Sequence, residues 1–167
     1  MYDGDIIAPH RTKLISGWDA GPNDVNLAWV LGMVYPDSMR VLWIDEYFTE
    51  DGDGDTFVQI VNSRLSLEWR KLGGFSIHVA DQPVFTKSNT ERRHCFADTM
   101  RRFGMAPIPG EIAFSTRRNN VLDMLRKIDT VVAGKVYPNF MIHERCELLR
   151  EAMKGGYAYP KVMGGVG

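Results

Sequence analysis

Two aspartates, Asp19 and Asp81, each stand at the end of a segment predicted to be a β-strand. If those strands are parallel neighbours, both carboxylates project from the edge where open α/β sheets place their ligands. Converging carboxylates repel each other unless a divalent cation lies between them, and oxygen ligands favour Mg²⁺ or Mn²⁺. Two such ions, roughly 3.5–4 Å apart, would stabilise the attacking and leaving oxygens of a phosphodiester cleavage. The alternative is that one or both aspartates cap loops or helices.

The first part of the chain predicts the strands that must position Asp19. Residues 14–19 form a short segment that ends at Asp19. Residues 39–48 are largely apolar on both faces. In residues 25–35 every second residue shares one apolar face: Val25, Leu27, Trp29, Leu31, Met33 and Tyr35. Alternation is the spacing of a β-strand, and a strand that is apolar on both faces is covered on both sides. Because short loops join the three strands, we expect an antiparallel meander.

The pattern then changes to alternating helices and strands. Apolar residues at helical spacing, with glycines after them, predict helices over 55–72, 89–103, 121–132 and 146–153. Strands are predicted over 75–81, 111–115 and 136–143. A meander followed by this alternation indicates an α/β fold, with a mixed sheet flanked by helices on both faces.

The composition is that of an ordinary globular protein. The chain has 167 residues, 44% hydrophobic and 25% charged, with a net charge of −1. We therefore expect one domain and no global field that attracts nucleic acid. No apolar run approaches the roughly 18 residues of a membrane helix, and the first ten residues lack the apolar region of a signal peptide. Two cysteines are too few for a disulfide framework, which favours a reducing cytosol.

Three segments resemble, in order, the motifs of one nuclease family. Residues 15–24, Ile-Ser-Gly-Trp-Asp-Ala-Gly-Pro-Asn-Asp, resemble the first acidic motif of the nuclease domain of tailed-phage large terminase subunits. Residues 77–83, Ile-His-Val-Ala-Asp-Gln-Pro, resemble the second acidic motif. Residues 141–151, followed by the aromatic pair Tyr157 and Tyr159, resemble the late motif of the family. The order and spacing agree over residues 13–160.

The resemblance implies an RNase H-like nuclease domain over residues 13–167, with residues 1–12 as an arm or linker. Asp19 and Asp81 would be the catalytic residues and would hold two Mg²⁺ or Mn²⁺ ions. The activity would be an endonuclease that cuts concatemeric viral DNA with little sequence specificity. Expected partners are double-stranded DNA and, in the full system, an ATPase motor domain, a portal and a small terminase subunit. No membrane is involved, and the expected location is the host cytoplasm.

The sequence departs from the family pattern in two ways. The third metal aspartate of the family lies in a final helix, and this sequence reaches Gly167 before any such motif. The domain is therefore expected to lack that helix, or to take its third acidic group from another part of the C-terminal region. Glu46 is a further candidate ligand; the alternative for Glu46 is an exposed charge on a strand. No P-loop motif occurs, so the chain is not expected to be an ATPase by itself.

Basic residues near the predicted edge are candidates for DNA contact. Lys87, Arg117 and Arg118 lie in loops expected to leave the edge that carries Asp81. Asn119 marks a predicted helix N-terminus, whose N–H groups bind phosphate well. Such contacts to phosphates carry no direct sequence information. The alternative is an ordinary solvated helix face.

Two rival functions stay open at this point. One is a non-catalytic DNA-binding or assembly module of the packaging machine, and the other is an RNase H-like junction resolvase. A calcium loop at residues 51–55 is excluded, because the EF-hand pattern needs Gly and Glu where Thr56 and Asn62 stand. A structural zinc site is not expected, because clustered Cys and His pairs at ligand spacing are absent.

Overall fold

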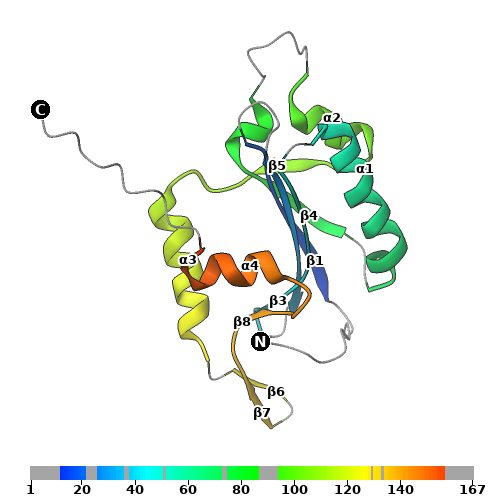
Figure 1. Ribbon diagram of the computed structural model, residues 1–167. Helices are drawn as coiled ribbons and strands as arrows, with labels where there is room; N and C mark the ends of the chain where they lie inside the picture. Colours follow the sequence, from blue (N-terminus) through cyan, green and yellow to red (C-terminus); the bar gives the residue numbers. More distant parts are fainter. Residues whose placement is uncertain are drawn as a thin grey trace, which may run out of the picture.

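A computed structural model describes residues 12–21, 26–35, 38–50, 52–72, 75–86, 94–128, 130–132 and 134–156 of the chain. These residues form a six-stranded sheet with helices on both faces (Figure 1). Three antiparallel strands follow one another along the chain: β1 (Lys13–Asp19), β2 (Leu27–Tyr35) and β3 (Arg40–Thr49). The predicted meander is confirmed.

The other strands of the sheet run parallel to their neighbours. β4 (Phe75–Ala80) pairs with β1, β5 (Pro107–Pro109) with β4, and β8 (Phe140–Ile142) with β3. The order across the sheet is β5-β4-β1-β2-β3-β8. The two prolines of β5 lie at an edge of the sheet, where a missing backbone N–H is tolerated. The predicted mixed sheet is therefore confirmed.

Helices α1 (Gly54–Arg64) and α2 (Phe96–Arg102) cover one face of the sheet, and α3 (Phe114–Arg126) and α4 (Glu147–Glu151) lie on the other (Figure 1). α1 continues through a π-helix, η2 (Leu65–Trp69), and a 3₁₀ turn, η3 (Arg70–Leu72). α4 continues into η5 (Ala152–Gly156). Among the described residues, no helix is long and apolar enough to span a bilayer.

The main core lies between the sheet and the α1–α2 layer. In β1 the buried side chains alternate with partly exposed ones, and Leu14, Ser16 and Trp18 are buried. The Trp18 ring lies 6.2 Å from that of Phe57 and 6.4 Å from that of Phe96, measured between centroids. By contrast, no residue of α3 is buried. The α3 side of the sheet is thus the more open one.

Some predicted boundaries differ from the structure. The strand expected over 111–115 lies at Pro107–Pro109 instead, and α3 begins at Phe114. The helix expected to reach residue 132 ends at Arg126, and β6 (Thr130–Val132) forms a hairpin with β7 (Lys135–Tyr137). β-Branched side chains favour the strand, and Gly134, with φ 77°, supplies the turn. The extended segment predicted over 136–143 is divided between β7 and β8.

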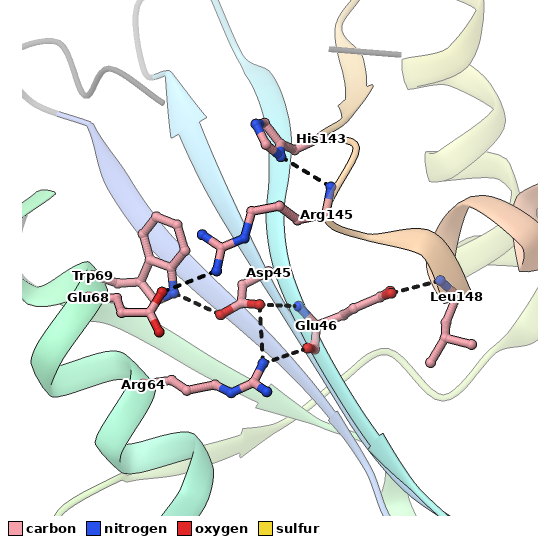
Figure 2. Close-up of polar contacts among 8 residues, drawn as sticks. All are labelled: Asp45, Glu46, Arg64, Glu68, Trp69, His143, Arg145 and Leu148. Atoms are coloured by element: carbon pink, nitrogen blue, oxygen red, sulfur yellow. Dashed lines mark hydrogen bonds and ion pairs between the residues drawn. The ribbon is translucent and has the colours of Figure 1, made fainter. Parts of the chain in front are cut away.

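A polar cluster around the buried Asp45 ties elements on both faces of the sheet to β3 (Figure 2). The Asp45 carboxylate accepts hydrogen bonds from the Trp69 indole N–H at 2.9 Å and from the Arg64 guanidinium at 3.4 Å. Arg145, which follows β8, donates to Glu68 at 3.1 Å, and its guanidinium lies 5.1 Å from the centre of a Trp69 ring. Asp45 therefore holds the end of the α1–η2 helix against β3.

Replacing Asp45 by Ala is expected to lower the free energy of unfolding by about 2–3 kcal/mol, because the buried Trp69 N–H loses a charged acceptor. Glu68→Ala is the control. It breaks an exposed ion pair with Arg145 and should cost less than about 1 kcal/mol. Urea denaturation of both variants measures the difference. Equal losses would contradict the role given to Asp45.

Candidate metal centre at the carboxyl edge of the sheet

Asp19 and Asp81 share one edge of the sheet because the strands that carry them are parallel neighbours. Asp19 is the last residue of β1, and Asp81 directly follows β4. Trp18 lies opposite Ala80 in the register of this pair. The backbone N–H of Asp81 donates to the carbonyl oxygen of Trp18 at 2.9 Å. The expected parallel pairing is confirmed, and it brings both aspartates to the same place.

Buried side chains below this edge also link β1 to β4. The Trp18 indole N–H donates to Ser16 Oγ at 2.7 Å, and Ser16 Oγ lies 2.7 Å from His78 Nδ1. Burial lowers the pKa of His78 and favours the neutral ring. Because the Trp18 N–H can only donate, a neutral ring with Nδ1 unprotonated would accept the Ser16 proton. This link holds the two strands in register three residues before each aspartate.

The electrostatics of the edge leave negative charge only partly compensated. Burial raises the pKa of Asp19, and the nearby negative charge of Asp81 raises it further. A hydrogen bond from the Ala20 backbone and the positive charge of Arg117 act in the opposite direction without cancelling the rise. A nearby cation would stabilise the ionised form of this carboxyl group. The pair therefore has the charge that a divalent ion would neutralise.

A cleft of about 570 Å³ opens between this edge and α3. Asp19, Asp81 and Arg117 line it, together with residues of β2 and Trp43 of β3. The floor includes Gly17, at which a Cβ atom would lie 3.0 Å from Val30 Cγ2. A larger residue at position 17 would therefore force the cleft floor to shift. The cleft gives a ligand direct access to both carboxylates.

Among the described residues, Arg117 is the basic residue that lines the cleft beside the two aspartates. Its guanidinium lies 3.5 Å from Asp81 Oδ1, and both side chains are partly exposed, at 45% and 37%. Asn120 and Val121 line the same cleft. These positions are three and four residues after Arg117, so they share one face of α3. That face of α3 is directed toward the cleft.

Two of the other predicted DNA-contact residues lie outside the cleft. Arg118 and Asn119 are exposed residues of α3 and do not line the cleft. The expectation of a helix N-terminus near Asn119 is wrong, because α3 begins at Phe114 and Asn119 is inside the helix. Its N–H is therefore not one of the unpaired donors of the first turn. Lys87 lies outside the described residues.

Glu46 has a structural contact in this fold. Its two carboxylate oxygens accept hydrogen bonds from the backbone N–H groups of Leu148 and Leu149 at 2.7 and 2.8 Å; Figure 2 shows the first. These are N–H groups of the first turn of α4, which an acidic side chain stabilises. Within the described ranges, no third Asp, Glu, His or Cys joins the aspartates in a metal-ligating group.

Glu111 and Asn120 also line the cleft, although neither was a predicted site residue. Glu111 follows the short strand β5, which is the parallel neighbour of β4, so the rule that located Asp81 also applies to it. Because the strand was predicted over 111–115, Glu111 was placed at the start of a strand and not after its end. In the structure, Glu111 Oε1 accepts a hydrogen bond from the Ala113 N–H at 2.9 Å.

The residues present fit a divalent cation such as Mg²⁺ or Mn²⁺. Asp19 and Asp81 supply only oxygen donors, which hard cations prefer. Burial first, and then the negative charge of Asp81, raise the pKa of Asp19, and a bound cation would favour the ionised form against both effects. The cleft leaves room for the water and phosphate oxygens that such an ion keeps in its coordination shell.

Asp19→Asn is expected to raise the melting temperature of the metal-free protein near pH 7. Because the pKa of Asp19 is raised on folding, its stabilising effect is present below the ordinary pKa of 3.8 and is lost as the pH rises through the raised value. The advantage of the variant should shrink as the pH falls toward the ordinary Asp value. Calorimetry in EDTA measures it. Identical melting temperatures near neutral pH would contradict the assigned electrostatics.

Comparison with known proteins finds similarity of fold. The nuclease domain of the P22 large terminase matches 92% of this chain and 72% of its own, with a TM-score of 0.56 and 13% identity. The nuclease domain of the large terminase from bacteriophage SPP1, solved with bound Mn, matches 78% and 60%, with a TM-score of 0.48 and 14% identity. The fowlpox virus Holliday junction resolvase matches 83% and 85%, with a TM-score of 0.42 and 12% identity.

No family model and no curated protein matches the chain. The likeness to the P22 domain extends over nearly the whole chain and agrees with the mixed sheet described above. At 13% identity it establishes the fold. The resemblance to the nuclease domains of phage large terminases is therefore confirmed at the level of the fold.

Proposed function

We propose that this chain is a divalent-metal-dependent endodeoxyribonuclease, with Asp19 and Asp81 as its metal ligands. The observation that carries the proposal is the meeting of the two carboxylates at the ends of parallel β1 and β4, in a cleft that also contains Arg117. A pair of acidic residues and a guanidinium is a combination that suits a phosphodiester, because one part binds cations and the other binds phosphate.

Four charged residues have distinct parts in this proposal. Asp19 and Asp81 would hold Mg²⁺ or Mn²⁺, two ions in the active state, with a third acidic group from the C-terminal region. Bound metal would supply the activated water and stabilise the leaving oxygen. Arg117 would donate hydrogen bonds to a phosphate oxygen, and Arg118 would attract the backbone from the exposed side of α3. Contacts of this kind predict little sequence specificity.

We further propose that the biological substrate is concatemeric viral DNA, cut during genome packaging. The support is the order of the sequence motifs together with the fold shared with the P22 terminase nuclease domain. On this proposal, residues 13–167 are the nuclease domain, residues 1–12 are an arm or linker, and an ATPase motor domain, a portal and a small terminase subunit act with it in the host cytoplasm. The motor activity would come from outside this sequence, which has no P-loop.

Supercoiled plasmid is expected to be nicked and linearised in Mn²⁺ or Mg²⁺, and not in EDTA. Asp19→Ala and Asp81→Asn should each lose at least about a hundred-fold in rate, because each removes a charged metal ligand. Asp123→Asn, a change of an exposed carboxylate on α3, is the matched control and should cut like the wild type. Glu46→Gln should also cut wherever its fold is intact. Full activity of Asp81→Asn would overturn the metal assignment.

Arg117→Ala combined with Arg118→Ala is expected to weaken duplex binding by a similar factor for unrelated sequences. The slope of log affinity against log salt should fall by up to about two, because each phosphate contact releases close to one counterion. Fluorescence anisotropy at several salt concentrations measures both quantities. An unchanged slope would mean that these arginines form an ordinary solvated helix face and do not contact phosphates.

A further inference from the structure

The pairing between Arg117 and Asp81 assigns one guanidinium two competing roles. Arg117 lies 3.5 Å from a carboxylate that the proposed function gives to a metal ion. The same side chain lines the cleft into which a phosphate would enter. An arginine is charged at every working pH and cannot be neutralised to resolve this competition. The guanidinium must therefore divide its hydrogen bonds between the carboxylate and any incoming phosphate.

The local charge balance indicates which partner Arg117 has before metal binds. Asp19, Asp81 and Arg117 together carry a net charge of −1 when both acids are ionised. The charge of Arg117 acts on Asp19 as well as on Asp81. In the metal-free protein the guanidinium is therefore attracted to the carboxylates. One divalent cation at the pair neutralises the two carboxylates, from −2 to 0, and so removes this attraction; a second ion would make the site positive and repel the guanidinium.

α3 is suited to such an exchange of partners. None of its residues is buried, and the Arg117 side chain is 45% exposed. A partly exposed arginine with a long flexible stem can change partner by side-chain rotation, without unpacking a core. The backbone of the helix need not move.

We propose that Asp81 holds Arg117 in reserve until a divalent cation occupies the carboxylate pair, and that the released guanidinium then binds the DNA phosphate. Metal and DNA therefore bind cooperatively through this one residue. The coupling is reciprocal: metal tightens DNA binding by the factor through which DNA tightens metal binding. This inference rests on the proposed function, because it takes Asp19 and Asp81 as the metal site.

The size of the effect follows from the exposure of the ion pair. A partly exposed ion pair contributes little free energy. Removing the Arg117 guanidinium, which competes with the metal for Asp81, should therefore tighten metal binding by about two- to five-fold. Arg118 offers a matched control. It has the same charge, is the next residue of the same helix, and does not line the cleft. Arg118→Ala therefore shows what the loss of one positive charge from α3 does when that charge lies outside the cleft.

The first measurement is Mn²⁺ titration of the DNA-free protein by isothermal calorimetry. Arg117→Ala should bind Mn²⁺ about two- to five-fold more tightly than the wild type, and Arg118→Ala should differ much less. The second is anisotropy of a short duplex in Ca²⁺ or in EDTA, with DNA integrity checked on a gel. The gain in affinity from Ca²⁺ should shrink in Arg117→Ala by a similar factor, whereas Arg118→Ala should weaken binding equally in both conditions.

The outcomes separate this inference from the proposed function. Equal shifts in the two arginine variants, with Mn²⁺ binding that depends on Asp19 and Asp81, would overturn the reserve role of Arg117 and leave the nuclease proposal intact. Mn²⁺ binding that is absent, or that is unchanged in Asp19→Ala, would overturn both. Tighter Mn²⁺ binding in Arg117→Ala alone, with reduced coupling to the duplex, would support both. Melting temperatures of all variants show that each comparison is made on folded protein.

Discussion

The parallel pairing of β1 with β4 is the constraint on which the rest of the molecule depends. Residues 62 positions apart meet because Asp81 N–H donates to the Trp18 carbonyl and because Ser16 Oγ contacts His78 in the core. The aromatic cluster around Trp18 packs both strands against α1 and α2. A one-residue slip would turn every side chain of a strand to the other face. Such a slip would move Asp19 from the open cleft to the buried side, so the core determines where the carboxylates point.

The two faces of the sheet therefore have different roles. The α1–α2 face contains most of the large buried side chains, and the Asp45 cluster secures the end of its helix. The opposite face keeps a cleft, and the helix beside it has no buried residue. Consecutive acids of β3 illustrate the division. Asp45 satisfies the Trp69 indole on one side, and Glu46 caps α4 on the other. Both acids of β3 make structural hydrogen bonds, whereas Asp19 and Asp81 face the cleft with their negative charge only partly compensated by Arg117.

Strong local patterns predicted the parts of this fold that depend on burial. Alternation located β1 to β3, and helical spacing located α1 with its continuation to Leu72. The rule that ligands gather at strand ends selected Asp19 and Asp81 without any knowledge of their contacts. The exposed region from residue 107 to 137 was harder. β5 is an edge strand of three residues, two of them prolines, and α3 has no buried residue. Neither element therefore has the regular spacing of apolar residues from which strands and helices are predicted. The place of Asn120 and Glu111 in the cleft therefore follows from the structure and not from the sequence pattern.

Although α3 is exposed, its starting point is fixed to the same edge as the aspartates. The Gly110 N–H donates to the Ala80 carbonyl at 2.9 Å, directly before Asp81, and a Cβ at position 110 would lie 3.1 Å from Val79 Cγ1. Glu111 then accepts from the Ala113 N–H, and Arg117 N–H donates to the Ala113 carbonyl in the first turn. Residues 110–116 thus connect the end of β4 to Arg117 through two backbone hydrogen bonds and one hydrogen bond to the Glu111 side chain. The guanidinium is free to rotate, yet its Cα is held within reach of Asp81, and this combination of a fixed anchor and a mobile charge is what an exchange between carboxylate and phosphate requires.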